Sequence, residues 1–209
     1  MTRTVILIPS RLNSKRLKNK PLLEIDNFPL VVHTYKRAMM SKICSEVYVC
    51  TDSTKIKKKC EEFSSKVIMT SSKHINGTER IAEAAKKLNL KNNDIIIDVQ
   101  GDEPLIDPKQ IDNTIKFFKK NKFEIVLPNI LMKNGSSKNI VKLVFDKNNQ
   151  VRWMSRSELP FYFKSTNKLF YKHLSIIAFT KKSLSKYANL KPSKNEKIES
   201  IELLRALEN

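Results

Sequence analysis

The sequence of 209 residues is poor in glycine, with only Gly77, Gly101 and Gly135. It contains neither the Gly-x4-Gly-Lys-Ser/Thr pattern of a P-loop nor the Gly-x-Gly-x-x-Gly pattern of dinucleotide-binding folds. Any phosphate site must therefore be built in another way. Glycine is useful where a backbone must approach a ligand closely, and the first two glycines lie in polar loops that are candidate site loops.

Cysteines and long apolar runs are also scarce. The three cysteines, Cys44, Cys50 and Cys60, show no Cys-x-x-Cys spacing, which disfavours a disulfide framework and indicates reduced thiols in a cytoplasmic protein. No apolar stretch approaches the ~20 residues that span a bilayer. Residues 1–4 lead directly into an apolar run, so we expect no signal peptide and no membrane insertion.

Acidic residues are outnumbered, with 21 Asp and Glu against 40 Lys and Arg and a formal net charge of +19. Such a charge raises the question of nucleic-acid binding. The lysines, however, are spread along the whole chain, and no interleaved aromatic residues offer a stacking platform. We expect no nucleic-acid partner, although a positive field can assist the capture of a small anionic substrate.

Strand and helix patterns alternate over the first 131 residues. The predicted strands are residues 4–8, 47–50, 66–69, 94–99 and 124–131, and the predicted helices are residues 29–40, 54–63, 78–90 and 107–120. Beyond them we expect a β-hairpin from residues 140–145 and 151–154, a strand at residues 170–179, and helices at residues 183–189 and 193–207. This order predicts an α/β fold with a doubly wound mixed, mainly parallel sheet and a β-hairpin excursion in the second half.

The segment Asp98-Val-Gln-Gly-Asp-Glu-Pro104 follows the apolar run of residues 95–97. Ligands of open α/β sheets bind outside the carboxyl ends of the strands. Asp102 lies just past such an end, where a carboxylate next to a glycine can hold Mg2+ against a phosphate. The alternative interpretation is an ordinary acidic turn after a strand.

Two further polar loops favour phosphate chemistry. The loop of residues 9–22 carries five cations, which can surround a triphosphate because arginine and lysine donate to phosphate oxygens. Residues 74–80 resemble a helix start at Gly77-Thr78, where backbone N–H groups form an anion site. The alternatives are a solvated charged loop and an ordinary helix cap. His74 either orders its loop or contacts a nucleotide.

Several short motifs, taken together in their order, carry a resemblance to a known family. They are Ile8-Pro9-Ser10-Arg11, Arg16-Leu17, Lys20-Pro21-Leu22, Thr51-Asp52, His74, Gly77-Thr78-Glu79-Arg80, Val99-Gln100-Gly101-Asp102-Glu103-Pro104, Val141-Lys142-Leu143-Val144, Ser155-Arg156-Ser157-Glu158-Leu159-Pro160, His173-Leu174, Ile198-Glu199, Glu202 and Leu204-Arg205. The set resembles the 3-deoxy-manno-octulosonate cytidylyltransferases, also called CMP-Kdo synthetases, and covers nearly the whole chain.

The resemblance implies an enzyme with a nucleotide-diphospho-sugar transferase-like fold in a single domain, residues 1–209. Its reaction is the transfer of CMP from CTP to 3-deoxy-manno-octulosonate (Kdo), an acidic eight-carbon sugar, with release of pyrophosphate. The product serves lipopolysaccharide biosynthesis. The resemblance also implies Mg2+ as cofactor, a cytoplasmic location and a homodimer built on the region after Leu131.

The same resemblance assigns roles to individual residues. Asp102 is the implied metal ligand, and Arg11, Arg16 and Lys20 are implied to hold the triphosphate, so that these four form the catalytic set. The implied nucleotide-binding residues are Pro9, Ser10, Arg11, Gly77, Thr78 and Arg80. The implied sugar-binding residues are Gln100, Arg156, His173 and Glu202.

The chain departs from the family pattern at Lys18-Asn19, at Ser175 and Ile177, and at Leu203, which replaces a glutamine. Compared with the family pattern, the sequence is also expected to lack the usual C-terminal strand and helix, including a second metal carboxylate. Three alternatives therefore stay open: a cytidylyltransferase for an amino-Kdo sugar, one for a sialic-acid-type sugar, and a truncated, inactive nucleotide-binding homologue.

Overall fold

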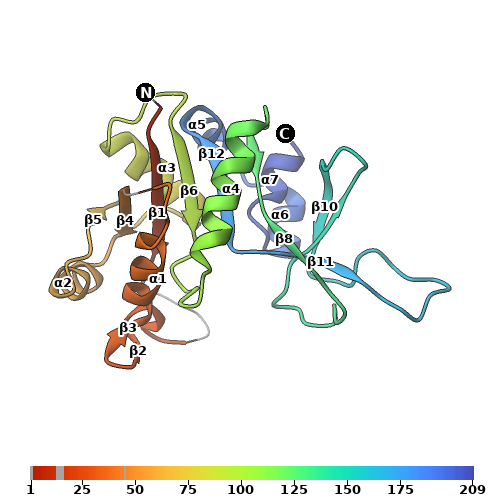
Figure 1. Ribbon diagram of the computed structural model, residues 1–209, viewed down its shortest axis with the longest axis horizontal. Coiled ribbons are helices and arrows are strands. Elements are labelled where there is room, and N and C mark those ends of the chain that lie inside the picture. The colour runs from red at the N-terminus through yellow and green to blue at the C-terminus, as the bar shows by residue number, and fades with distance from the viewer. Residues whose placement is uncertain (1, 13–16, 45) are drawn as a thin grey trace. The chain divides into compact units, whose positions relative to one another are not determined.

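The computed structural model describes residues 2–12, 17–44 and 46–209, and the chain divides into two compact units (Figure 1). The first unit comprises Met1–Val126 and Ser175–Ala188, and the second comprises Leu127–Leu174 and Asn189–Asn209. Each unit has its own sheet and is described by itself. The expectation of one cytidylyltransferase domain over residues 1–209 stays a prediction.

The first unit is built on a six-stranded sheet with the order β5-β4-β1-β6-β12-β7. Its strands are β1 (Thr4–Ser10), β4 (Glu46–Thr51), β5 (Val67–Met69), β6 (Ile95–Val99), β7 (Ile125–Val126) and β12 (Ile176–Thr180). The four strands from β5 to β6 are parallel, whereas β12 pairs antiparallel with both β6 and β7. This is the mixed, mainly parallel sheet that the sequence predicts.

Five helices accompany this sheet: α1 (Leu30–Met39), α2 (Thr54–Glu62), α3 (Gly77–Lys87), α4 (Pro108–Lys120) and α5 (Lys181–Asn189). Figure 1 shows α1 and α4 next to each other in front of the sheet, and the two helices contact one another. Strand β1 is central, and Val5, Ile6, Leu7 and Ile8 are completely buried. An unbroken apolar run is the pattern of a strand covered on both faces.

Three helices of this unit begin at side-chain caps. The side chain of Ser53 accepts from the Ile56 N–H, that of Asn76 from the Glu79 N–H, and that of Asp107 from the Lys109 N–H. Each cap satisfies an N–H group that lacks a partner within its helix. The predicted start at Asp107, with proline in the first helical turn, is confirmed.

A short excursion between β1 and α1 was not predicted. It consists of the 3-10 helix η1 (Lys20–Leu22) and a small hairpin of β2 (Glu24–Ile25) and β3 (Phe28–Pro29). Asp26 and Asn27 form the hairpin turn with φ values of 46° and 64°. Asp and Asn tolerate this left-handed region better than most residues, so the Asp26-Asn27 pair was the signal that sequence reasoning missed.

The second unit contains a four-stranded antiparallel sheet with the order β10-β9-β11-β8. Its strands are β8 (Asn129–Met132), β9 (Lys142–Phe145), β10 (Val151–Ser155) and β11 (Phe170–His173), and its helices are α6 (Lys194–Glu199) and α7 (Leu204–Leu207). Strands β9 and β10 form the predicted hairpin. Its turn is held by the Asp146 side chain, which accepts from the N–H groups of Asn148 and Gln150.

Two predicted strands were wrong because each is divided between the two sheets. The strand expected at residues 124–131 is β7 and β8, and the strand expected at residues 170–179 is β11 and β12. Pro128, which has no N–H to donate to a ladder, lies at the first division. Leu174 lies at the second, and its N–H donates to the Pro128 carbonyl. The sequence pattern of each predicted strand did not reveal that its two halves pair with different sheets.

The helix predicted at residues 193–207 is also two helices. Helix α6 ends at Glu199, and the next residue, Ser200, has a left-handed backbone with φ 52° and ψ 46°. Ile201 and Leu204 are buried, but Ile198 and Leu207, which belong to the same predicted apolar face, are exposed. The regular spacing was therefore a misleading signal, because the left-handed residue Ser200 interrupts the helix on which that spacing depends.

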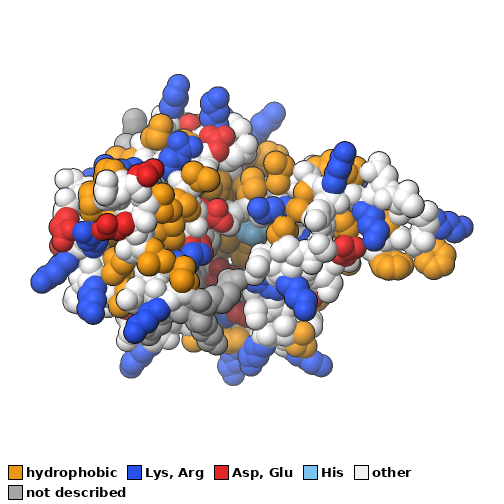
Figure 2. All heavy atoms as spheres, turned by 90° about the horizontal axis from the view of Figure 1, so that it is seen from below, with side chains coloured by type: hydrophobic (Ala, Val, Ile, Leu, Met, Phe, Trp, Pro, Cys, Tyr) orange, Lys and Arg blue, Asp and Glu red, His pale blue; other side chains and the backbone are white. Residues whose placement is uncertain are grey.

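No helix within the described part of the chain is long and apolar enough to cross a membrane. On the face of the molecule seen in Figure 2, lysine and arginine side chains are scattered among acidic, apolar and neutral groups. The basic residues are thus dispersed over this face, as they are along the sequence.

Candidate nucleotide site and active site

The candidate nucleotide loops meet at Pro9, near the carboxyl end of β1. A Cβ atom on Gly101, which follows β6, would lie 2.8 Å from the Pro9 carbonyl oxygen, and one on Gly77 would lie 3.1 Å from Pro9 Cγ. Neither glycine has a positive φ. Their lack of a side chain is therefore needed for close packing of loop on loop, a reason that differs from the expected close approach of a ligand.

Lys20 and Asp102 form an ion pair within this group of loops. Lys20 begins η1, and its Nζ lies 2.5 Å from Oδ2 of Asp102. The Lys20 side chain is 34% exposed and the Asp102 side chain is 48% exposed. Both charged groups can therefore be reached by a solute, and the structure brings together two of the predicted catalytic residues from distant parts of the sequence.

The hydroxyl of Ser10, the last residue of β1, is buried. Its Oγ has no hydrogen-bond partner among the described residues. A buried polar atom without a partner costs about 1–3 kcal/mol. The atom is thus available to a ligand that can reach it, which agrees with the predicted role of Ser10 at the nucleotide.

The predicted nucleotide arginines are held in different ways. Arg11 is exposed, and its Nη1 donates to the Ile75 carbonyl over 3.4 Å. Arg80 is buried: its Nη1 donates to Thr70 Oγ1 over 2.7 Å, and its Nη2 lies 3.4 Å from Oδ2 of Asp52. Arg80 therefore ties α3 to the ends of β4 and β5. Arg16 lies outside the described residues.

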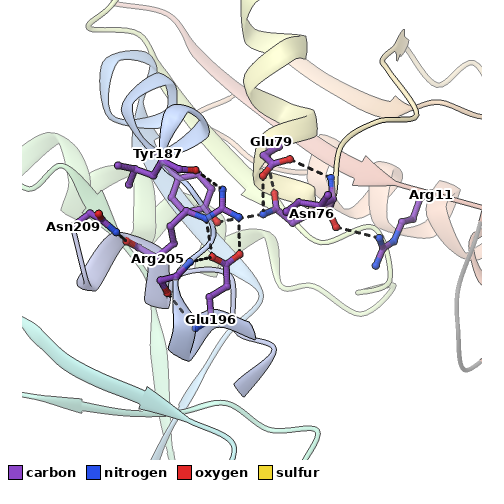
Figure 3. Close-up of polar contacts among 10 residues, drawn as sticks. Arg11, Asn76, Glu79, Tyr187, Glu196, Arg205 and Asn209 are labelled. Atoms are coloured by element: carbon purple, nitrogen blue, oxygen red, sulfur yellow. Dashed lines mark hydrogen bonds and ion pairs between the residues drawn. The ribbon is translucent and has the colours of Figure 1, made fainter. Parts of the chain in front are cut away.

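The loop before α3 is ordered by its own side chains (Figure 3). Asn76 Oδ1 accepts from the Glu79 N–H, and Glu79 Oε2 accepts from the Ile75 N–H. Asn76 Nδ2 also donates to the hydroxyl of Tyr187 on α5 over 3.5 Å. Thr78, the second residue of the helix, is buried. The predicted helix start is confirmed, one residue earlier than expected.

His74 contributes to the same order. Its Nε2 lies 2.5 Å from Oε2 of Glu83, which also accepts from the Ser71 N–H and pairs with Lys87. Burial would raise the pKa of Glu83, but hydrogen bonds from Lys87, the Ser71 backbone and His74 together lower it to about 2. Of the two roles open to His74, the structure supports the ordering of the loop.

Gln100 is oriented by a residue that the sequence reasoning left without a role. Its Nε2 donates to both carboxylate oxygens of Asp98, over 3.2 and 3.1 Å. Asp98 is completely buried within β6. An aspartate inside an otherwise apolar strand was the available signal, because a buried carboxylate needs hydrogen-bond donors. Nearby, Glu103 accepts from the hydroxyl of Ser175 over 2.6 Å.

The other predicted sugar residues belong to the second unit. Arg156 follows β10, and each of its three guanidinium nitrogens donates to a backbone carbonyl: Nε to that of Glu199, Nη1 to that of Lys138 and Nη2 to that of Ser200. Glu202 lies between α6 and α7 and is partly buried.

His173 ends β11, and its Nδ1 is buried without a partner among the described residues. Burial lowers the pKa of His173 to about 4. The imidazole is therefore neutral near pH 7 and offers one unoccupied nitrogen to a ligand.

Asp102 is the predicted protein ligand of the metal. The described residues hold no group of three or more His, Cys, Asp and Glu side chains suited to a metal ion. Mg2+, however, is commonly held by one or two carboxylates together with phosphates and water. A partly exposed carboxylate next to the ammonium of Lys20 fits that requirement, so Asp102 is a suitable single protein ligand.

Comparison with known proteins decides the family. A family model described as cytidylyltransferase matches residues 5–209. The chain belongs to the cytidylyltransferase family. The 3-deoxy-manno-octulosonate cytidylyltransferase of Thermodesulfovibrio yellowstonii is 43% identical over 220 residues, which cover 99% of this chain and 86% of the relative.

Two further relatives agree. The 8-amino-3,8-dideoxy-manno-octulosonate cytidylyltransferase of Shewanella baltica is 39% identical, over 97% of this chain and 85% of its own length. A solved structure of CMP:2-keto-3-deoxy-manno-octonic acid synthetase complexed with CTP superposes with a TM-score of 0.91 at 31% identity, over 99% of this chain and 86% of that one. The predicted family, fold class and enzyme class, a nucleotidyltransferase, are confirmed.

Proposed function

We propose that this cytidylyltransferase joins CMP from CTP to the anomeric hydroxyl of 3-deoxy-manno-octulosonate and releases pyrophosphate. The observation that carries the proposal is the meeting of Pro9, Gly77 and Gly101, with the reachable Lys20–Asp102 pair on the same loops. The identity to the T. yellowstonii relative supports this sugar. The product would serve lipopolysaccharide biosynthesis.

In this proposal the nucleotide is held by the loops after β1 and before α3. Arg11, Arg16 and Lys20 bind the triphosphate, and the charge of Lys20 moves from Asp102 toward a phosphate when CTP arrives. Ser10, with its unsatisfied hydroxyl, and the backbone of Pro9, Gly77 and Thr78 line the cytidine pocket. Arg80 acts as a positioning residue, because its guanidinium already holds Asp52 and Thr70.

Asp102 would hold Mg2+ in the reacting complex. When bound there, Mg2+ would supply positive charge beside the triphosphate, as the metal ions of phosphoryl-transfer enzymes commonly do. The protein positions the metal ligand: Gly101 packs against Pro9, and this packing places the carboxylate of the next residue, Asp102, beside Lys20.

The sugar acid is proposed to contact Gln100, His173 and Glu202. Asp98 fixes the Gln100 amide with its nitrogen toward the carboxylate, which leaves the amide oxygen to accept from a sugar hydroxyl. His173 offers its unpartnered Nδ1. Arg156 is proposed to support this group through the backbone it holds, since each of its three guanidinium nitrogens donates to a backbone carbonyl.

A second candidate acceptor is the 8-amino sugar. The S. baltica relative that carries this substrate in its name is 39% identical, close to the 43% of the Kdo relative. Of the departures from the family pattern, Ser175 and Ile177 follow the proposed sugar contact His173 within four residues, and Leu203 directly follows Glu202. They are the positions at which discrimination between the two sugars is expected.

We also propose a homodimer in the cytoplasm. Ile130 and Leu131, neighbours on the edge strand β8, are 53% and 48% exposed, and Phe161 and Phe163 are exposed in the same unit. Apolar residues on an open strand edge favour pairing with another chain, and the proposed occupant is a second copy. Light scattering of the purified protein, compared with an Ile130→Lys variant, tests the dimer.

The proposed cytoplasmic location is supported by the three free, buried cysteines, which fit a reducing compartment.

The proposed reaction is tested by pyrophosphate release from the purified chain. CTP with Mg2+ should support turnover with Kdo, and ATP and GTP should not. Parallel reactions with the 8-amino sugar and with a sialic acid decide between the acceptors. Samples without sugar, and samples with a metal chelator, are the controls. Absence of pyrophosphate release with every sugar, or equal thermal protection by CTP, ATP and GTP, would contradict the proposal.

A further inference from the structure

A buried lysine in the second unit has no role in the proposed reaction. Lys142, the first residue of β9, has no exposed surface. Its ammonium donates to three backbone carbonyls, those of Ser137, Ile140 and Arg156. A lysine ammonium has three protons, so all of its donors are satisfied by main chain.

Burial of this charge has a free-energy cost that packing alone does not explain. Burial lowers the pKa of Lys142, although Glu158 and Glu199 oppose the effect. The three hydrogen bonds of its ammonium all go to backbone carbonyls rather than to a carboxylate. An apolar side chain of similar size is often neutral or stabilising in place of a buried charge. The lysine therefore holds the backbone at Arg156, which an apolar side chain could not do.

Arg156, whose carbonyl is held by Lys142, in turn holds the end of α6. Its guanidinium donates to the carbonyls of Glu199 and Ser200 over 2.8 and 3.0 Å. Its N–H donates to Glu199 Oε2, and the Ser155 hydroxyl donates to Glu199 Oε1. The turn at Ser200 is left-handed, a conformation that is unfavourable for a residue with a side chain. Bonds from Arg156 to the backbone of Glu199 and Ser200 and to the Glu199 carboxylate thus hold this turn, which lies two residues before Glu202.

We propose that Lys142 is a positioning residue for the sugar acid: through Arg156 and Glu199 it sets the place of Glu202. The inference rests on the proposed sugar contact of Glu202. The ammonium of Lys142 acts at a distance and contacts no substrate. Its removal should loosen residues 199–203, while the nucleotide loops of the first unit keep their own hydrogen bonds.

The test is Lys142→Met, which keeps most of the side-chain length and removes the charge. The KM for Kdo should rise roughly tenfold or more, the scale of losing hydrogen bonds of a charged group. The KM for CTP and the thermal shift on CTP binding should stay unchanged. Lys147→Met, an exposed lysine in the turn of the same hairpin, is the matched control and should behave as the unchanged protein.

Glu199→Gln supplies a second variant in case Lys142→Met does not fold. It keeps the shape of the carboxylate but removes one of the two acceptors, so the KM for Kdo should rise in the same way, to a smaller extent. A normal KM for Kdo in either folded variant, or an equal rise of KM for both substrates, would overturn the inference. If the unchanged protein does not use Kdo at all, the proposed function fails, and the inference fails with it.

Discussion

In the first unit, Lys20 and Arg11 remain partly or fully exposed, and Lys20 faces a carboxylate that is itself exposed. In the second unit, Lys142 and Arg205 have no exposed surface, and Lys142 and Arg156 donate to main-chain carbonyls. The same residue types are thus accessible at the proposed nucleotide site of the first unit, whereas in the second unit they hold the backbone in place. The difference lies in burial and in the partners: Lys20 pairs with an exposed carboxylate, whereas Lys142 is enclosed by backbone carbonyls.

Arg205 is a strongly held buried cation of the second unit (Figure 3). It binds Glu196 through two parallel bonds, from Nε to Oε2 over 2.8 Å and from Nη2 to Oε1 over 2.7 Å. Its Nη1 donates to the Leu190 carbonyl. Glu196 also forms a reciprocal capping box with Ser193 at the start of α6. The pair therefore connects both short helices of the second unit.

The largest expected effect is on stability, from Arg205→Ala. Removal of one partner leaves the buried Glu196 carboxylate uncompensated, which costs about 3–5 kcal/mol. Thermal or urea unfolding measures the loss. The matched control is Arg152→Ala, which breaks an exposed pair with Asp146 of nearly equal length, 2.6 Å. Similar melting temperatures for the two variants would contradict the distinction between buried and exposed cations.

The next effect is on turnover, from Asp102→Asn. Loss of a carboxylate that stabilises the reacting phosphate should reduce kcat at least ~100-fold. The melting temperature should change little because the side chain is exposed. Asp107→Asn, an exposed residue of the same loop whose capping role asparagine can fill, serves as control. Retained activity at ordinary Mg2+ concentrations would show that Asp102 is not the metal ligand.

A smaller effect is expected from Gly101→Ala. The added methyl group would lie 2.8 Å from the Pro9 carbonyl, so the loop after β6 must move. Overpacking of this kind costs about 1–3 kcal/mol, and the shift should also lower kcat by displacing Asp102. Gly77→Ala meets the movable ring of Pro9 at 3.1 Å and should be milder. The reverse order in melting temperature and kcat would disprove the packing explanation.

The smallest expected effect is a pH dependence due to His173. Because burial lowers its pKa to about 4 from 6.5, the unfolded chain takes up a proton at higher pH than the folded chain does. This contribution to stability is full above pH 6.5 and is lost as the pH falls toward 4. His173→Gln should flatten the change in melting temperature over that interval, and an unchanged slope in this variant would contradict the effect of burial.

The first unit was largely predictable because its signals are local. An apolar run such as Val5–Ile8 forms a central strand wherever it is covered on both faces, and Asp107-Pro108 starts a helix by its own geometry. The position of Asp102 past β6 followed from the run that precedes it. The split strands around Pro128 and Leu174 were not predictable in the same way, because pairing with one sheet or another is a long-range choice.

The sequence by itself determined the family, the order of the elements and the residue types at the strand ends, because these depend on short motifs and local periodicity. Only the tertiary structure decided what each charged residue does. Lys20 and Lys142 are both lysines within family-like motifs, but one is reachable and the other is enclosed by three carbonyls. Burial and hydrogen-bond partners come from segments distant in sequence, so no local pattern contains them.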